Sequence, residues 1–519
     1  MKSISFKHKI AVCALAVFTF TFSCTKDLDL YPTNGISSEV QFKTLQGYKQ
    51  GLVTLYSTLS LNNFLRYYWN MQELTTDEAV STWDDPQGIL SYHKMSWTAD
   101  NVAVDLVYSA VIYDITLCNN FIIESSESNI GKRGFSGTDA DAIRQYAAEA
   151  RYLRAYYYWV LMDLYGNPPF ATESTLAAGD IPKQIKRNDL FVYIESELKA
   201  IESTMAASRS NEYGRADQAA VWALLARMYL NGEVYTGTEH YTDAITYCKK
   251  VIDAGYSLVT NYGWLMLADN YLNTSEFILT ANYDNANEIT WGGTNYLALG
   301  AAGVPKEVNG MSDTWNSFRF TQSIPKLFPT TDTTVDKRAE FWTKGQTLNV
   351  DQLAISTNGY SSYKYRNLSR AGVAFVQNNS YNNISDIDFP LFRLAEIYLI
   401  YAEALLRQGS GGDNNTALAY INKLRGRAYA NDPNSTAGNI TSADLNLDFI
   451  LDERARELYW ECFRRTDLIR YNKFVTASYL WAWKGGVLSG TAVDGKYNLF
   501  PLPTSDLLSN PNLKQNSGY

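Results

Sequence analysis

The strongest hydrophobic pattern in the chain lies at residues 389–408, where apolar side chains recur at steps of three and four. This spacing is typical of one face of an α-helix. The residues that have it are Leu391, Leu394, Tyr398, Ala402 and Leu405. Other apolar residues fill most of the remaining circumference, so we expect a helix that is buried on nearly every side. The charged residues that interrupt this surface share one stripe: Arg393, Glu396, Glu403 and Arg407. We expect them to form ion pairs within the helix.

Similar periodicity predicts further helices that follow one another in pairs. The pairs are 104–123 with 140–165, 216–230 with 241–254, 389–408 with 417–429, and 449–462 with 464–474. Alanine at close-contact positions and tyrosine deeper in each pair are typical of tetratricopeptide-like hairpins, and their irregular spacing indicates degenerate repeats. We therefore predict a mostly α-helical fold (all-α class), with a scaffold of such hairpins at about residues 104–254 and 389–475.

Between these two parts of the scaffold, residues 255–385 are rich in Gly, Asn, Thr and aromatic residues and show little periodicity. Loops on a rigid scaffold often carry function, so we expect this loop-rich insertion to form a large ligand-binding face. No Pro/Gly/Ser-rich linker divides the chain, which favours a single domain over residues 24–519.

The N-terminus has the features of a signal peptide. Several lysines precede an apolar run at residues 10–22, which is too short to span a bilayer as a helix. Ser23 and Cys24 then resemble a bacterial lipoprotein processing site, although Thr21 replaces the usual leucine and leaves ordinary cleavage nearby as the alternative. The acidic start after Cys24 resembles the surface-export signal of Bacteroidetes lipoproteins. We predict a signal peptide at residues 1–23, lipidation of Cys24, and a lipid anchor in the membrane.

Charge and cysteine content narrow the choice of partners. The net charge of −9 argues against nucleic acid as a partner. The later cysteines, Cys118, Cys248 and Cys462, have no metal-ligand spacing, so we expect buried free thiols.

Motifs of catalysis are missing from the sequence. The mature chain keeps only His93 and His240, and neither belongs to a nucleophile motif. Asp77 with Glu78, and Asp84 with Asp85, could supply the paired carboxylates of a glycoside hydrolase. Solvated or capping carboxylates are the commoner outcome, so we predict that the protein is not an enzyme and keep the hydrolase as an alternative.

Four segments together resemble one protein family. They are FRLAEIYLIYAEALLRQG, AEARYLRAYYYWVLMDLYG, ERARELYWECFRRTDLIRY and the tail NPNLKQNSGY. Each is similar to a segment of the SusD family of outer-membrane glycan-binding lipoproteins. The resemblance implies a tetratricopeptide scaffold under a loop-rich face, at the cell surface of the outer membrane. It also implies a partner, a TonB-dependent transporter of the SusC type, for which the protein acts as a lid and capture site.

Two further segments, GRADQAAVWALLARMYLNGEVYTG and YLWAWKGGVLSGTAV, resemble the starch-binding founding member of this family. Its aromatic arc is similar in position to three tryptophans: Trp83, Trp291 and Trp315. The second position is a tyrosine in the founder, so Trp291 keeps the ring and loses a hydroxyl. A sugar-binding arginine matches Arg66, whereas an asparagine falls on Pro86, with Asp85 and Gln87 beside it. The founder's calcium-associated loop is shortened here, around Asp269, Asn270 and Glu276, so we carry over no metal or other cofactor, although these oxygen ligands leave a calcium ion open.

An arc of aromatic rings also has a direct physical interpretation. A pyranose can pack its C–H face on a ring while its hydroxyl groups stay in water, and rings set along a curve would favour a bent α-1,4-glucan over a straight chain. We therefore expect starch and maltooligosaccharides as ligands. The alternatives are another glycan, a hydrolase, a peptide-binding scaffold that ignores sugars, and tryptophans that only pack in the core.

Overall fold

The computed structural model of the protein describes residues 38–83, 87–375 and 383–519. Within these ranges the chain is mostly helical, so the predicted fold class is confirmed. The predicted signal peptide, the lipidation residue Cys24 and the site residue Asp85 lie outside the described residues.

Most of the regular structure consists of α-helices. The first half contains α2 (Ser38–Gln41), α3 (Leu45–Ser57), α4 (Tyr67–Glu73), α5 (Leu90–Lys94), α6 (Val102–Glu124), α7 (Glu127–Lys132), α8 (Gly137–Leu164), α9 (Glu173–Ala178), α10 (Arg187–Ile201), α11 (Gln218–Leu230), α12 (Gly232–Thr236) and α13 (Tyr241–Asp253). The second half contains α14 (Gly293–Gly300), α15 (Lys306–Asn309), α16 (Leu394–Leu406), α17 (Asn414–Ala430), α18 (Leu447–Leu458), α19 (Arg464–Arg470) and α20 (Thr504–Ser509).

The strands are short and form two-stranded antiparallel sheets. They are β1 (Pro169–Phe170) with β2 (Lys183–Gln184), β3 (Phe277–Ala281) with β6 (Phe389–Arg393), and β4 (Phe341–Trp342) with β5 (Ser361–Ser362). Two of these sheets hold strands of the predicted insertion, in which the other described elements are α14, α15 and short 3-10 helices.

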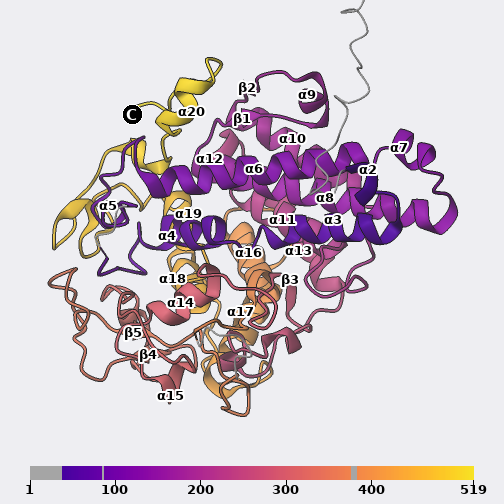
Figure 1. Ribbon diagram of the computed structural model, residues 1–519. Coiled ribbons are helices and arrows are strands. Elements are labelled where there is room, and N and C mark those ends of the chain that lie inside the picture. The colour runs from indigo at the N-terminus through magenta and orange to yellow at the C-terminus, as the bar shows by residue number, and fades with distance from the viewer. Residues whose placement is uncertain (1–37, 84–86, 376–382) are drawn as a thin grey trace, which may run out of the picture.

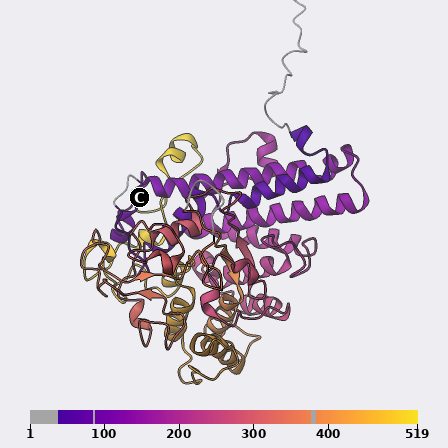
Figure 2. The same cartoon turned by 60° about the horizontal axis from the view of Figure 1, so that its bottom comes forward.

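Packing between helices follows the predicted pairs in three cases. Helix α6 packs on α8, α11 on α13, and α16 on α17, while α13 also packs on α16 and joins the pairs into one scaffold. Figure 1 shows the long helices α3, α6 and α8 side by side, with α14, α15, β4 and β5 gathered on another side of the molecule. The same separation is visible after rotation in Figure 2. The fourth pair differs, because α18 packs mainly on α16 and α19 on α4.

Helix α6 is long and apolar enough to cross a membrane by length and composition. Its contacts are those of a core helix, since it packs against α8, α3 and α4. Residues such as Val104, Val107 and Val111 are completely buried in these contacts. Burial accounts for the apolar residues on this face of the helix, whereas others, such as Tyr113, are exposed.

The prediction of one helix over residues 389–408 is wrong at its N-terminal end. Phe389–Arg393 forms strand β6, and helix α16 begins at Leu394. Strand β6 pairs with β3, which is more than a hundred residues earlier in the chain, and every residue of both strands is buried. Pro390 and two phenylalanines favour an extended conformation here.

The charged stripe of this segment was also predicted wrongly, because most of its ion pairs leave the helix. Only Glu403 and Arg407 pair within it, at 2.9 Å. The remaining partners come from other elements: Arg393 with Glu461 at 2.7 Å, Glu396 with Arg227 at 2.6 Å, and Glu403 with Arg470 at 2.7 Å. A helix surrounded by protein has no solvent to hydrate these charges, so neighbouring elements must supply opposite charges.

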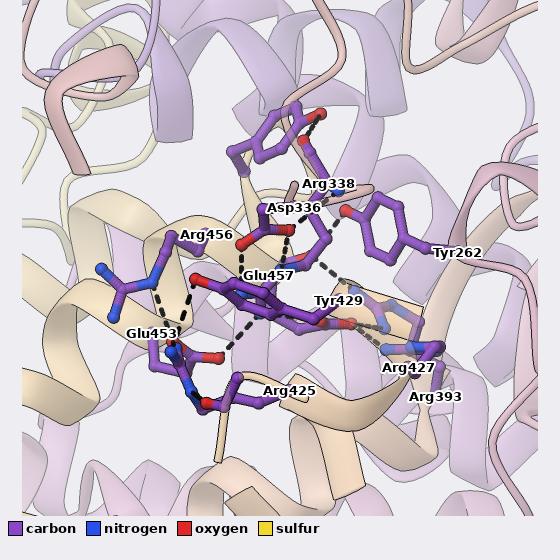
Figure 3. Close-up of polar contacts among 12 residues, drawn as sticks. Tyr262, Asp336, Arg338, Arg393, Arg425, Arg427, Tyr429, Glu453, Arg456 and Glu457 are labelled. Carbon is purple, nitrogen blue, oxygen red and sulfur yellow. Dashed lines mark hydrogen bonds and ion pairs between the residues drawn. The ribbon is translucent and has the colours of Figure 1, made fainter. Parts of the chain in front are cut away.

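A buried network of ion pairs fastens the insertion to the scaffold (Figure 3). Arg338, from the insertion, contacts Asp336 and the α18 residue Glu453, each at 2.8 Å. Glu457 on α18 lies between Arg393 and Arg427. Breaking one partner of such a pair leaves an uncompensated buried charge, so the network fixes how the loop-rich face sits on the helices.

The predicted free thiols are confirmed for the described cysteines. Cys118, Cys248 and Cys462 are all buried and unbonded to one another. Burial raises the pKa of each thiol above its usual value, which makes these side chains chemically inert.

Candidate functional site

Helix α14 organises the three predicted tryptophans into one cluster. Trp291 lies two residues before the helix, and the backbone N–H of Trp315 donates to the carbonyl of Leu299 on its last turn, at 2.5 Å. Gly293 begins the helix with φ of 52°, and a Cβ atom there would lie 1.6 Å from the Tyr283 hydroxyl oxygen. Only glycine fits at this first position of α14, so the position of Trp291 depends on Gly293.

Trp83 reaches the same place from the N-terminal part of the chain. The preceding Val80 forms a two-way backbone bridge with Arg319, with N–O distances of 2.8 and 3.0 Å. The Ser81 backbone N–H donates to Nε2 of the buried His93 at 3.0 Å. Burial lowers the pKa of His93 to about 3, which keeps the ring neutral and able to accept this bond. His93 therefore positions the loop that carries Trp83.

The three rings touch in series. Ring centres of Trp83 and Trp315 are 5.7 Å apart with planes inclined by 52°, and those of Trp315 and Trp291 are 6.0 Å apart with planes inclined by 36°. Trp315 contacts both neighbours and is the middle member. All three side chains are half-buried, so part of each ring faces solvent. The inclinations show that the three rings of this aromatic surface do not lie in one plane.

Two completely buried rings support this surface from below. Tyr296 on α14 lies 5.5 Å from the Trp83 ring centre, and Phe318 lies 5.3 Å from it. Tyr296 also contacts Trp315, at 6.3 Å. These contacts hold the tryptophans in fixed orientations. Sequence reasoning missed Tyr296 as a supporting residue, although it stands in the same TWGGTNY stretch as Trp291.

Arg66 joins the cluster from a π-helical turn, η2 (Asn62–Arg66), which leads into α4. Its guanidinium carbon lies 4.3 Å from the centre of the Tyr296 ring, and its Nη1 donates to the Trp291 carbonyl at 3.4 Å. Nε has no hydrogen-bond partner, and no carboxylate of the described residues pairs with Arg66. A π-helical turn is a common device at functional sites. Arg66 is therefore a hydrogen-bond donor held beside the aromatic surface.

The remaining predicted site residues are not brought into this cluster by the described part of the chain. Gln87 is half-buried, and its carbonyl accepts the N–H of Ala103 at the start of α6, at 3.1 Å. Among the described residues, Gln87 makes no ring or polar contact with the tryptophans. Its predicted role and that of Asp85 stay predictions.

Two of the carboxylates considered for hydrolysis are structural. Asp77 is fully buried and accepts two hydrogen bonds from the Arg464 guanidinium, each 2.8 Å. Glu78 is also buried, and it accepts the backbone N–H of Trp460 at 2.9 Å. Burial raises the pKa of Glu78 to about 7. Neither side chain can reach a glycosidic bond, whereas Asp84 and Asp85 lie outside the described residues.

The oxygen ligands considered for calcium face protein groups instead. Glu276 pairs with Arg393 at 3.1 Å and with Arg427 at 2.8 Å. The Asn270 amide group is bonded to the backbone of Leu265 and Asp388. Glu276 is thus neutralised by two guanidinium groups, whereas Asp269, the other acidic residue of the set, accepts the backbone N–H of Arg370 at 2.9 Å. The calcium ion stays a prediction.

Comparisons with known proteins agree with this architecture. A family model described as "SusD family" matches residues 332–519, and one described as "Starch-binding associating with outer membrane" matches residues 31–230. The starch-binding protein SusD of Bacteroides thetaiotaomicron is 35% identical, and the alignment covers 100% of both chains. The chain belongs to the SusD family. The resemblance inferred from four sequence segments is thus confirmed, and a SusD-like protein of Bacteroides ovatus, 24% identical over 91% of this chain and 84% of its own, is a further relative.

Solved structures share the SusD fold. A SusD homologue of Bacteroides thetaiotaomicron has a TM-score of 0.74 at 19% identity, covering 93% of this chain and 99% of its own. Surface glycan-binding protein A from the same organism, in complex with laminarihexaose, has a TM-score of 0.69 at 18% identity, covering 91% and 99%. At such low sequence identities, the structural similarity is evidence for the fold alone.

Proposed function

We propose that this protein is a cell-surface starch-binding lipoprotein that captures α-1,4-glucans and maltooligosaccharides and delivers them to a SusC-type TonB-dependent transporter. The observation that carries the proposal is the inclined cluster of Trp83, Trp315 and Trp291, with Arg66 beside it. It occurs in a chain that is 35% identical along its whole length to a protein named for starch binding.

The physical chemistry of the cluster suits a sugar chain. The exposed part of each indole ring can cover the C–H face of one pyranose unit, and the Arg66 guanidinium can donate to a hydroxyl group. Contacts with Tyr296 and Phe318 already fix the rings, so binding need not immobilise them. A preformed apolar surface with a few directional donors is the usual design of a small-ligand site.

The environment of Asp77 and Glu78 supports binding without cleavage. Asp77 and Glu78 are held by Arg464 and Trp460 inside the protein, out of reach of a ligand on the tryptophans. Incubation with amylose or maltoheptaose should release no new reducing ends. Sustained turnover that disappears on mutation of Asp84 or Asp85 would instead support the glycoside hydrolase.

Cell-surface placement rests on the N-terminal segment. A lipid on Cys24 would anchor the protein in the outer membrane, and the acidic residues after it would direct the protein outward. There it would lie over the mouth of its transporter, where captured glucan is needed. Protease added to intact cells should therefore degrade it.

Isothermal titration calorimetry of the soluble chain tests the ligand. We expect heat of binding with maltoheptaose and amylose, and weak or no binding with cellohexaose and laminarihexaose. Preference for laminarihexaose would retain a glycan-capture role with a different glycan. Failure to bind any polysaccharide of a broad panel would remove the glycan role and favour a peptide-binding helical scaffold.

A further inference from the structure

A cavity lies beside the loop that leads to Trp291. It has a volume of about 510 Å³ and is formed by η2, the middle of α6 and the end of the loop before α14. Its walls include Leu61, Phe64, Tyr113, Asp114, Ile289 and Thr290. This volume falls within the range of roughly 300–1,000 Å³ that small-molecule sites occupy.

Three apolar side chains of these walls are exposed to solvent. The exposed fraction is 60% for Tyr113, 52% for Ile289 and 48% for Leu61. Apolar side chains that gather around one concavity mark a binding surface more often than scattered ones do. The aromatic member, Tyr113, is a residue on which a ligand ring can pack.

Asp114 supplies a polar group at this cavity, and its environment is unusual. The residue is only 4% exposed, its Oδ2 has no hydrogen-bond partner, and no cationic side chain of the described residues pairs with it. A buried carboxyl group without such a partner costs stability. Tyr157 and Thr58 hydrogen-bond the same carboxyl group, which leaves Oδ2 as its atom without a protein partner, and this oxygen points to a ligand.

The protonation of Asp114 indicates which ligands fit. Burial raises its pKa to about 7, and the nearby hydroxyl groups of Tyr157 and Thr58 oppose this rise. The group is therefore poised between acid and carboxylate at neutral pH. An alcohol hydroxyl both donates and accepts, so it can pair with either form, whereas an ammonium group requires the carboxylate.

We propose that this cavity is a second saccharide subsite, in which the Tyr113 ring packs on the C–H face of a pyranose and the Asp114 carboxyl group binds its hydroxyls. The inference rests on the proposed glucan-binding function. The two sites are linked through the loop before α14. Thr290, in the cavity wall, donates to the Ser60 carbonyl at 3.3 Å, and the carbonyl of the next residue, Trp291, accepts from Arg66 at 3.4 Å. A second contact on the same glucan would favour long chains over short ones by raising the local ligand concentration.

Methyl NMR of protein labelled at isoleucine methyl groups tests this proposal, because Ile289 lies in the wall of the cavity. Maltotriose is titrated into the wild type and into Trp315→Ala, which removes the middle ring of the tryptophan cluster. We expect the Ile289 methyl signal to shift in both proteins, while Ile181, an exposed isoleucine of the segment between α9 and β2, stays still. A shift of Ile289 in the wild type alone would mean that the loop only reports binding at the tryptophans, and would overturn the proposal.

Variants of the cavity provide the second readout, measured in the Trp315→Ala background. Asp114→Leu and Tyr113→Ala should each lower the affinity for maltotriose, measured from the Ile289 shift, by roughly three- to tenfold. Asp114→Asn should lower this affinity less. Asp114→Leu also removes the hydrogen bonds of Tyr157 and Thr58 to this carboxyl group, so its melting temperature is measured as well. Where that temperature falls, Tyr113→Ala, at an exposed residue, decides, with the exposed Tyr271→Ala as its control.

The outcomes separate this proposal from the general function. No Ile289 shift at any concentration, with maltoheptaose still bound at the tryptophans by calorimetry, would overturn the second subsite and leave starch capture standing. Unchanged Ile289 responses in Asp114→Leu and Tyr113→Ala would overturn it as well. Loss of calorimetric binding in the wild type would instead remove the proposed function itself.

Discussion

The guanidinium carbon of Arg66 lies 4.3 Å from the centre of the Tyr296 ring. The same buried ring contacts Trp83 and Trp315, so the charged donor and two of the tryptophans all pack on Tyr296. Stacking on an aromatic face suits the planar guanidinium group and restricts its motion. A donor restricted in this way loses little entropy when a ligand binds.

Arg66→Lys tests this arrangement. The substitution keeps the positive charge but removes the planar fork that stacks on Tyr296. We expect affinity for maltoheptaose to fall by roughly tenfold, as for loss of a hydrogen bond from a charged donor. The melting temperature should change little, because no carboxylate of the described residues pairs with Arg66. Equal affinity of the two proteins would contradict a direct role for the guanidinium group.

Trp315→Ala should have the largest effect among the three tryptophans, since its ring contacts both neighbours. Removal of one aromatic anchor costs about 1–3 kcal/mol of binding energy, or a factor of roughly five to a hundred and fifty in affinity. Calorimetric titration with maltoheptaose measures this loss. Trp222→Ala is the matched control, because Trp222 is also half-buried and donates to Glu202 on the scaffold. Both variants should melt earlier, and only Trp315→Ala should bind less tightly.

The helical scaffold could be predicted because its signal is local. Periods of three and four residues along single stretches indicated α6, α8, α11, α13, α16 and α17. Strand β6 escaped detection because its extended state depends on pairing with β3, whose residues lie far away in sequence. Likewise, Arg470 is 67 residues from its partner Glu403, and spacing along a helix carries no record of such a contact.

In the candidate site, too, local features could be predicted from the sequence and long-range contacts could not. Trp83, Trp291 and Trp315 stood out because each is an aromatic residue in a polar loop, and their mutual contact came from the family resemblance rather than from spacing. Tyr296 gave no separate signal, since a buried tyrosine in a short helix resembles ordinary core. Its role becomes visible only when Arg66, from another part of the chain, is placed over its ring.

Acid stability should depend on Glu403, which accepts two hydrogen bonds from Arg470 at 2.7 and 2.8 Å. Burial acts to raise the pKa of Glu403, but Arg470 and Arg407 more than offset it and lower the pKa from 4.5 to about 2. A carboxyl group with a lowered folded pKa stabilises the fold fully above its unfolded pKa, and this contribution is lost as pH falls from about 4.5 toward 2. Glu403→Gln should therefore melt well below the wild type at pH 7 and approach it at low pH.

Differential scanning calorimetry from pH 2 to pH 7 measures this difference. Glu127→Gln is the control, because Glu127 pairs with Arg144 at the surface, where such pairs contribute little. Its melting curve should follow the wild type throughout. A Glu403→Gln curve that stays parallel to the wild type at every pH would contradict the assignment of acid sensitivity to this ion pair.

Lipidation is predicted at Cys24, where a short apolar run and the small residue Ser23 precede the cysteine. Cells fed a radioactive fatty acid should label the wild-type protein and not Cys24→Ala. The variant should also leave the membrane fraction, because a lipid is the predicted anchor. Equal labelling of the two proteins would exclude Cys24 as the modified residue and favour ordinary cleavage nearby.

Curvature of the aromatic surface should decide which glucan binds. The planes of successive rings are inclined by 52° and 36°, so a ligand that touches all three must bend with them. An α-1,4-linked chain has a natural helical bend, and α-cyclodextrin fixes that bend before binding, which reduces the entropy lost in the complex. We expect α-cyclodextrin to bind at least as tightly as a linear maltooligosaccharide of the same length in calorimetric titrations. Cellohexaose, whose β-1,4 chain is straight, should compete poorly, and Trp315→Ala should lose the preference for the cyclic ligand. If cellohexaose competes as well as maltohexaose, the inclined rings do not select for chain shape, and the starch assignment fails even though a glycan-binding role could stand.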